Sequence, residues 1–306
     1  MQLYESTREH AVATPDGRWL RVREAGDPAG APVLVHHGMP SVGLVSVRSH
    51  EDALARGLRL VAWDRPGYPG SCRLPGRTVD AAARDAVVVA DALRAGRFMA
   101  YGMSAGGPHA LAVAALVPER VVAAAVMASP APFDADGLDW SAGRDGASRA
   151  SLEQAVDDPD GYRGTLEAAR RRLLASTPGT LHRELAHQLS PVDAAALSAG
   201  FAASVHARQT AALADGVDGW LDDTLALLRP WGFDVAEVRC PVLVVHGSHD
   251  QMSPPAHGRW LAAHLPRAEA RLGGEHGHVR HTAGDPAPVH AWLRRQWELA
   301  EPLPPA

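Results

Sequence analysis

The sequence predicts an α/β protein in which helices flank a mostly parallel, eight-stranded sheet and a helical cap is inserted between two strands. Three observations lead to this fold class. The chain opens on a hairpin-like pattern, apolar runs then alternate with helix-like stretches, and residues 131–230 interrupt that alternation. The 306 residues are 46% hydrophobic and 21% charged, which is typical of a globular protein that buries a large core.

The first two strands are expected in REHAVAT (8–14) and RWLRVREA (18–25), which the turn PDG joins into a hairpin. Six further strands are expected at residues 32–36, 58–63, 97–102, 120–128, 240–247 and 268–272. Helix-like segments, such as residues 78–95 and 105–117, lie between them. Strands that alternate with helices predict a mostly parallel sheet covered on both faces.

Residues 131–230 differ from the rest of the chain in pattern and in charge. They are rich in alanine, leucine, arginine and aspartate, and they show no clear strand pattern. We therefore expect a helical cap here, inserted into an α/β core formed by residues 1–130 and 231–306. The segment carries fifteen acidic residues and nine arginines, a net charge of −6. That acidity mildly favours neutral or cationic substrates over anionic ones.

Composition excludes several classes of function. All 30 basic residues are arginine, so no lysine is present for a pyridoxal phosphate Schiff base or a nucleotide-binding P-loop. The net charge of −5 argues against nucleic acid as a partner. Cys72 and Cys240 lie far apart in unlike contexts, which predicts no disulfide and a reducing compartment. With no apolar signal core and no stretch suited to a membrane span, a cytoplasmic protein is expected.

The stretch GMSAGG (102–107) follows an expected strand and begins an expected helix. This is the context of a nucleophile elbow, in which glycines flank the serine because the sharp turn leaves no room for side chains beside it. Ser104 is therefore the candidate nucleophile. A plain strand-to-helix turn with a capping serine is the alternative interpretation.

A serine nucleophile needs a base, and the base needs an acid to orient it, with the chain order Ser, Asp, His in this kind of fold. Asp250 follows the expected strand at 240–247, and the loop GGEHGHV after the last strand offers His276 and His278. The glycine before His278 gives the backbone freedom to turn that ring into the site, so His278 is the expected base. Asp134 is the weaker rival for the acid.

An oxyanion hole requires two backbone N–H groups directed at the developing negative charge. Ala105, the residue after the candidate nucleophile, supplies one. The second is expected from Met39, in the loop HHGMP that follows the strand at 32–36.

Together these segments resemble the α/β-hydrolase fold family, in particular its capped esterases, proline iminopeptidase-like enzymes and haloperoxidases that need no cofactor. The matching segments are HHGMP, WDRPGYPGS, GMSAGG, VLVVHGSHD and GGEHGHV, which span nearly the whole expected core. The resemblance implies the same roles for Ser104, Asp250, His278, Met39 and Ala105. The elbow lacks the tryptophan that proline iminopeptidases usually carry, which argues against peptidase specificity.

The expected function is that of a serine hydrolase, most simply a carboxylesterase, acting on an ester or less readily an amide of a small organic molecule. No cofactor and no metal are expected. The only partner expected is that substrate, with no nucleic acid and no membrane, and the protein is expected to be a monomer or homodimer. A lyase, perhydrolase or cyclase on the same fold remains an alternative, as does a non-catalytic ligand receptor.

Overall fold

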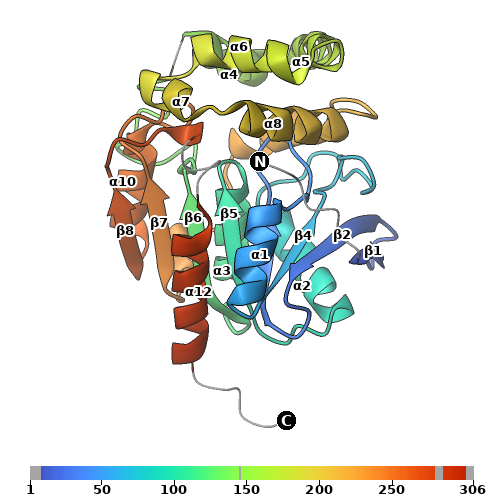
Figure 1. The fold of residues 1–306 in the computed structure, drawn as a ribbon, viewed down its shortest axis with the longest axis vertical. Coiled ribbons are helices and arrows are strands. Elements are labelled where there is room, and N and C mark those ends of the chain that lie inside the picture. Colours follow the sequence, from blue (N-terminus) through green and yellow to red (C-terminus); the bar gives the residue numbers. More distant parts are fainter. Residues whose placement is uncertain (1–7, 145, 280–284, 301–306) are drawn as a thin grey trace.

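A computed structural model describes residues 8–144, 146–279 and 285–300 and shows the predicted α/β fold (Figure 1). Its eight-stranded sheet has the order β1-β2-β4-β3-β5-β6-β7-β8. The β1/β2 and β2/β4 pairs are antiparallel, and every other pair is parallel. The strands are β1 (Arg8–Ala13), β2 (Trp19–Gly26), β3 (Ala31–His36), β4 (Leu58–Trp63), β5 (Phe98–Met103), β6 (Val121–Met127), β7 (Val242–His246) and β8 (Ala268–Leu272).

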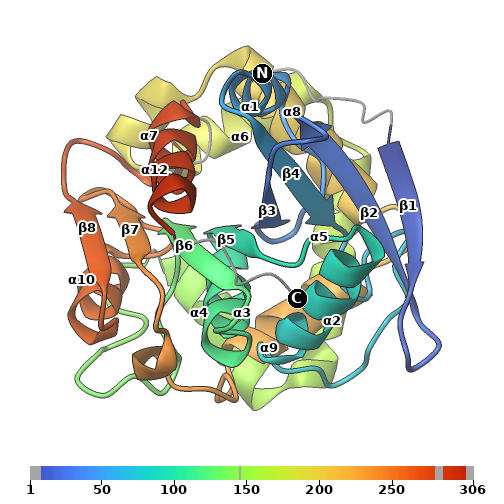
Figure 2. The ribbon, with the colours of Figure 1, turned by 90° about the horizontal axis from the view of Figure 1, so that it is seen from below.

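Helices cover both faces of the sheet (Figure 2), and an apolar layer on each face holds them against it. Successive side chains of a strand point to opposite faces, so Leu34 of β3 joins one layer and its neighbour Val33 joins the other. The first layer packs against α2 (Ala81–Ala92), α3 (Gly106–Leu116) and α10 (Pro255–His264). The second packs against α1 (Val47–Ala55) and α12 (Ala287–Leu299). Both faces of the parallel strands are therefore apolar, as the continuous apolar runs predicted.

Between β6 and β7 the described chain contains helices and loops, and no strand. The helices are α4 (Gly146–Asp157), α5 (Pro159–Leu174), α6 (Pro178–Gln188), α7 (Pro191–Ala196), α8 (Ala199–Ala212), α9 (Asp218–Leu227) and the short 3-10 helix η1 (Val235–Glu237). In Figure 1, α4 to α8 lie above one end of the sheet. The boundaries of a cap domain at 131 and 230 stay a prediction.

No helix in the described part of the chain is long and apolar enough to cross a membrane.

The turn between β5 and α3 is tightly crowded by backbone atoms. Ser104 lies in the left-handed region, with a φ of 53°. A Cβ on Gly102 would lie 2.3 Å from the Gly106 carbonyl oxygen, and one on Gly106 would lie 2.1 Å from the His36 carbonyl oxygen. Any side chain at either position would overlap backbone, so only glycine is accommodated. The turn thus brings the start of α3 directly against the end of β3.

Replacing Gly106 with alanine should destabilise the protein by at least about 2 kcal/mol, because the new methyl group would displace the β3 backbone rather than a movable side chain. Gly164→Ala in α5 is the matched control, since a Cβ there meets nothing within 4 Å. That control should be neutral or stabilising by about 0.5–1 kcal/mol, because alanine has the higher helix propensity. Urea unfolding of both variants measures the difference, and equal stabilities would contradict the close approach.

Candidate active site

Ser104 begins the site, because the turn after β5 projects it from the carboxyl end of a central strand. Its positive φ is uncommon for a residue with a side chain and marks a strained turn. In open parallel sheets, ligands bind at this edge.

Asp250 lies just beyond β7 and is 2% exposed. Its Oδ1 accepts hydrogen bonds from the backbone N–H groups of Met252 at 2.9 Å and Ser253 at 2.8 Å, which fix the carboxylate. Burial alone would raise the pKa of Asp250. The neighbouring His278 and the hydrogen bonds from His246 and His278 outweigh burial, so the pKa is lowered and the group is ionised at neutral pH.

His278 is joined to that carboxylate by a hydrogen bond of 2.9 Å between Nδ1 and Asp250 Oδ2. The ring is 6% exposed. Burial alone would lower the pKa of His278, but the Asp250 charge and the hydrogen bond outweigh it and raise the pKa above the usual value. A carboxylate on Nδ1 leaves Nε2 available toward the other side of the ring, which is the arrangement a general base requires.

The rival assignments receive less support. Asp134 is exposed, whereas Asp250 is buried and bonded to a histidine. The histidine bonded to Asp250 Oδ2 at 2.9 Å is His278. The structure thus pairs Asp250 with His278.

Ser104 and His278 line one cavity of about 160 Å³ between the strand ends and the helices above them. Met39, Pro40 and Met103 line it from the core side. From α6, α8 and the loops beside them come Leu185, Leu189, Phe201, Val205, Arg208 and Gln209. The lining is thus mainly apolar, with a few polar groups, which suits a small organic ligand.

The loop after β3 lies against the serine turn. A Cβ on Gly38 would lie 3.6 Å from the Ser104 Cβ. No hydrogen bond from the backbone N–H of Met39 or Ala105 to another residue is found within the described ranges. Both amides therefore remain available to a ligand atom, as two oxyanion donors would need to be.

Arg65 sets the orientation of that loop. Its guanidinium donates to the carbonyl oxygen of His37 at 2.5 Å and to that of Gly38 at 3.1 Å. In a trans peptide the C=O and the following N–H point in opposite directions. Because the Gly38 carbonyl points to Arg65, the Met39 N–H points away from Arg65.

Arg65 is held in turn by Asp223 of α9, a fully buried carboxylate. The guanidinium donates to it at 3.0 Å and 2.6 Å, and the Tyr68 hydroxyl donates at 2.8 Å. Burial would raise the pKa of Asp223, but Arg65 and Arg77 outweigh it and hold the pKa well below the usual value. The charge is therefore permanent. Through Arg65, which lies 158 residues before Asp223, it ties the loop after β3 to α9.

The sequence analysis did not identify Arg65, Asp223 or Arg208 as residues near the site. Asp223 carries no local motif, since it is one of two adjacent aspartates in an amphipathic helix. Nothing in the sequence indicates which of the 30 arginines it meets.

Comparison with known proteins shows the family of this chain. The model of the alpha/beta hydrolase fold family matches residues 31–280, which is most of the chain. The chain belongs to the α/β-hydrolase fold family. The match covers β3 to β8 and every candidate site residue described above.

This α/β hydrolase is similar to two curated esterases. It is 29% identical to the pimeloyl-[acyl-carrier protein] methyl ester esterase of Nitrosomonas europaea over 74% of its own length and 81% of that protein. It is also 29% identical to the rhodomycin D methylesterase DauP of Streptomyces sp. over 84% of its length and 88% of that protein. These relatives support hydrolase activity.

Among solved structures, a thermophilic esterase from Thermogutta terrifontis aligns with a TM-score of 0.66 and 20% identity, covering 96% of this chain and 99% of that one. At that identity the likeness shows the fold alone.

The His278–Asp250 pair should be visible in the titration of the histidine. Histidine NMR should give His278 a pKa above the usual value of about 6.5, and Asp250→Asn should bring it below that value, because burial remains when the charge is lost. Because the pKa of His278 is higher in the folded protein than in the unfolded chain, protonation of His278 stabilises the fold. This stabilisation is complete below the unfolded pKa of about 6.5 and is lost as the pH rises through the folded pKa.

His290 is an internal control for that titration. It also contacts a carboxylate, Asp52 at 2.7 Å, but Asp52 is shared with Arg56. Burial is the largest influence there and lowers the pKa of His290. Asp250→Asn should leave His290 unchanged. A His278 pKa that does not respond to Asp250→Asn would contradict the pairing.

Proposed function

We propose that this α/β hydrolase is a serine carboxylesterase that cleaves esters of small organic molecules. Ser104 is the nucleophile, His278 is the base, and Asp250 is the carboxylate that orients His278. The observation that carries the proposal is the hydrogen bond that His278 donates to the buried, ionised Asp250, together with the position of His278 in the same cavity as the strained Ser104. The two methyl ester esterases among its relatives favour an ester over an amide.

In the first half of the reaction, Ser104 Oγ attacks the ester carbonyl carbon while His278 Nε2 takes the hydroxyl proton. The carbonyl oxygen becomes an oxyanion, and the N–H groups of Met39 and Ala105 stabilise it. The intermediate collapses when the C–O bond to the alcohol breaks and His278 returns its proton to the leaving oxygen. The products of this half are a free alcohol and an acyl group on Ser104.

In the second half, His278 takes a proton from water as the water oxygen attacks the acyl carbon. Collapse of the second oxyanion breaks the bond to Ser104 Oγ, which regains the proton from His278, and the carboxylic acid leaves. Asp250 stays ionised throughout and stabilises the imidazolium. Every step uses groups of this chain and water, so the proposed reaction requires no cofactor.

The cavity limits the substrate to a small group near the serine. About 160 Å³ of mainly apolar space accommodates a short acyl chain or a small aryl group. The helices that close the cavity come from residues 131–230, so we propose that this segment serves as the cap that selects substrates.

Ser104→Ala should lower kcat for a short-chain aryl ester by about 10⁴-fold or more and abolish labelling by a fluorophosphonate. The wild-type protein should both react with the fluorophosphonate at Ser104 and turn the ester over. Labelling without turnover would indicate a ligand receptor, and turnover by Ser104→Ala would overturn the serine mechanism.

A matched pair of histidine variants tests the base. His278→Ala should cost nearly as much as Ser104→Ala, because nucleophile and base act as one unit. His276→Ala removes a histidine of the same loop without touching Asp250 and should lower kcat/KM by less than about tenfold. An inactive His276→Ala beside an active His278→Ala would reverse the assignment.

A further inference from the structure

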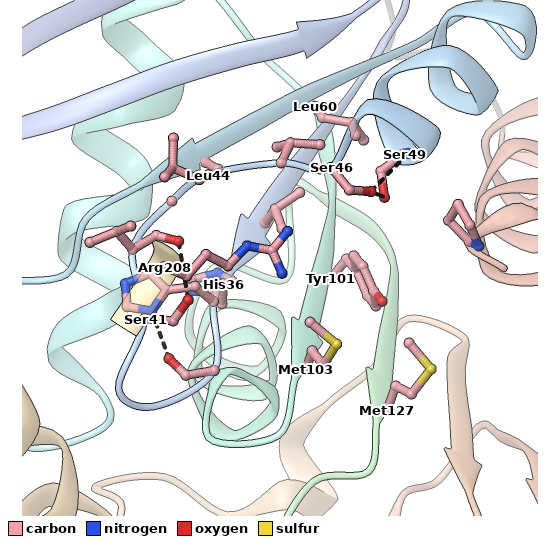
Figure 3. Close-up of a pocket in the computed structure, with 18 of the residues that line it drawn as sticks. His36, Ser41, Leu44, Ser46, Ser49, Leu60, Tyr101, Met103, Met127 and Arg208 are labelled. Carbon is pink, nitrogen blue, oxygen red and sulfur yellow. Dashed lines mark hydrogen bonds between the residues drawn. The ribbon is translucent and has the colours of Figure 1, made fainter. Parts of the chain in front are cut away.

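A second cavity of about 90 Å³ adjoins the one that holds Ser104. The two cavities share Gly38, Ser41, Met103 and Arg208 in their linings. Of these four residues only Arg208, on α8, carries a charge. Figure 3 shows its guanidinium inside the second cavity, extending toward Tyr101.

Arg208 has no protein partner within the described residues. It makes no ion pair and no hydrogen bond there, and its buried Nε lacks an acceptor. Two buried arginines of this fold are neutralised: Arg65 by Asp223 and Arg23 by Asp64. Burial lowers the pKa of Arg208 to about 10, with Tyr101 acting in the opposite direction, so the group stays cationic at neutral pH. A partly buried cation without a counter-ion is costly, which points to an anionic ligand.

The rest of the second cavity suits an anion. Hydroxyl groups of Ser41, Ser46, Ser49 and Tyr101 line it, and they can donate hydrogen bonds. Asp285 is the one acidic residue among the lining residues of both cavities that the structure describes. Its side chain is 59% exposed and lies 3.9 Å from Arg48, and no ion pair joins it to Arg208 within the described residues.

We infer that the natural substrate carries a carboxylate besides the ester to be cleaved, and that Arg208 binds this carboxylate while the ester carbonyl lies at Ser104. This inference rests on the proposed esterase function. A preference for a carboxylate is the opposite of the preference for neutral or cationic substrates that the net charge of residues 131–230 indicated. Asp222 and Asp223 of that segment are already paired with arginines, whereas the charge of Arg208 is uncompensated and faces the ligand.

Matched pairs of aryl esters test the inference. In one pair the carboxylate is on the acyl side: 4-nitrophenyl hydrogen adipate against 4-nitrophenyl 6-methylheptanoate, in which an isopropyl group replaces it. In the other pair it is on the alcohol side: 4-acetoxyphenylacetate against 4-isobutylphenyl acetate. In at least one pair, the wild-type kcat/KM should be about tenfold or more higher for the carboxylate ester than for the neutral one. That pair shows whether Arg208 binds a carboxylate on the acyl side or on the alcohol side.

Arg208→Leu should lower that ratio by about tenfold to a hundredfold, because a charge-assisted bond is lost in a poorly hydrated site. Arg208→Lys keeps the charge and should retain part of the preference. Arg172→Leu removes the same charge from an exposed position of α5 and should leave the ratio within about twofold. A wild-type preference for the neutral ester in both pairs, or an unchanged ratio in Arg208→Leu, would overturn the inference.

Binding separates a failure of this inference from a failure of the proposed function. Calorimetry of the Ser104→Ala protein with the intact esters should show tighter binding of the carboxylate member of the favoured pair, and adding Arg208→Leu should remove that advantage. Equal binding of both members overturns the role of Arg208 even if Ser104 hydrolyses esters. Selective binding without any hydrolysis by the wild type keeps the role of Arg208 and overturns the esterase proposal.

Discussion

The close approach of α3 to the end of β3 is the constraint on which the site depends. The Gly106 Cα faces the His36 carbonyl oxygen with no room for a Cβ, so the loop after β3 and the turn at Ser104 lie against each other. Met39 and Ser104, which are 65 residues apart in sequence, thereby line one cavity. The left-handed conformation of Ser104 costs about 1–3 kcal/mol, and the packing of β5, β6 and α3 around the turn sustains it.

Two buried carboxylates, Asp223 and Asp250, hold the other groups of the site in place. Asp223 does so through arginine, and Asp250 through histidine. Asp223 accepts from Arg65, Arg77 and Tyr68, and the fixed Arg65 sets the direction of the peptide before Met39. Asp250 accepts from two backbone amides and from His278, so its charge orients a histidine, the residue we propose as base. Asp223 thus holds groups that stay charged, and Asp250 holds one that can titrate. The contrast follows from the partners, since arginine stays protonated and histidine titrates near neutral pH.

The sequence predicts the core of this fold well because its signals are local. Apolar runs located all eight strands to within a few residues, and the resemblance to one family agreed with the glycine pattern around Ser104. The position of Asp250 and His278 after successive strands followed from chain order. Arg65 with Asp223, and Arg208 beside Ser104, depend on how α8 and α9 lie above the sheet, which no local pattern encodes. The net charge of residues 131–230 gave no guide to the cavity, because most of those acids lie elsewhere.

The most direct test of the central claim is to trap the acyl group on the enzyme. Wild-type protein is mixed with excess of a short-chain aryl ester, quenched in acid within milliseconds, and digested for mass spectrometry. The proposal predicts a mass increase equal to the acyl group on the peptide that contains Ser104, formed together with a burst of released phenol. Ester turnover without any acyl adduct on that peptide would contradict it.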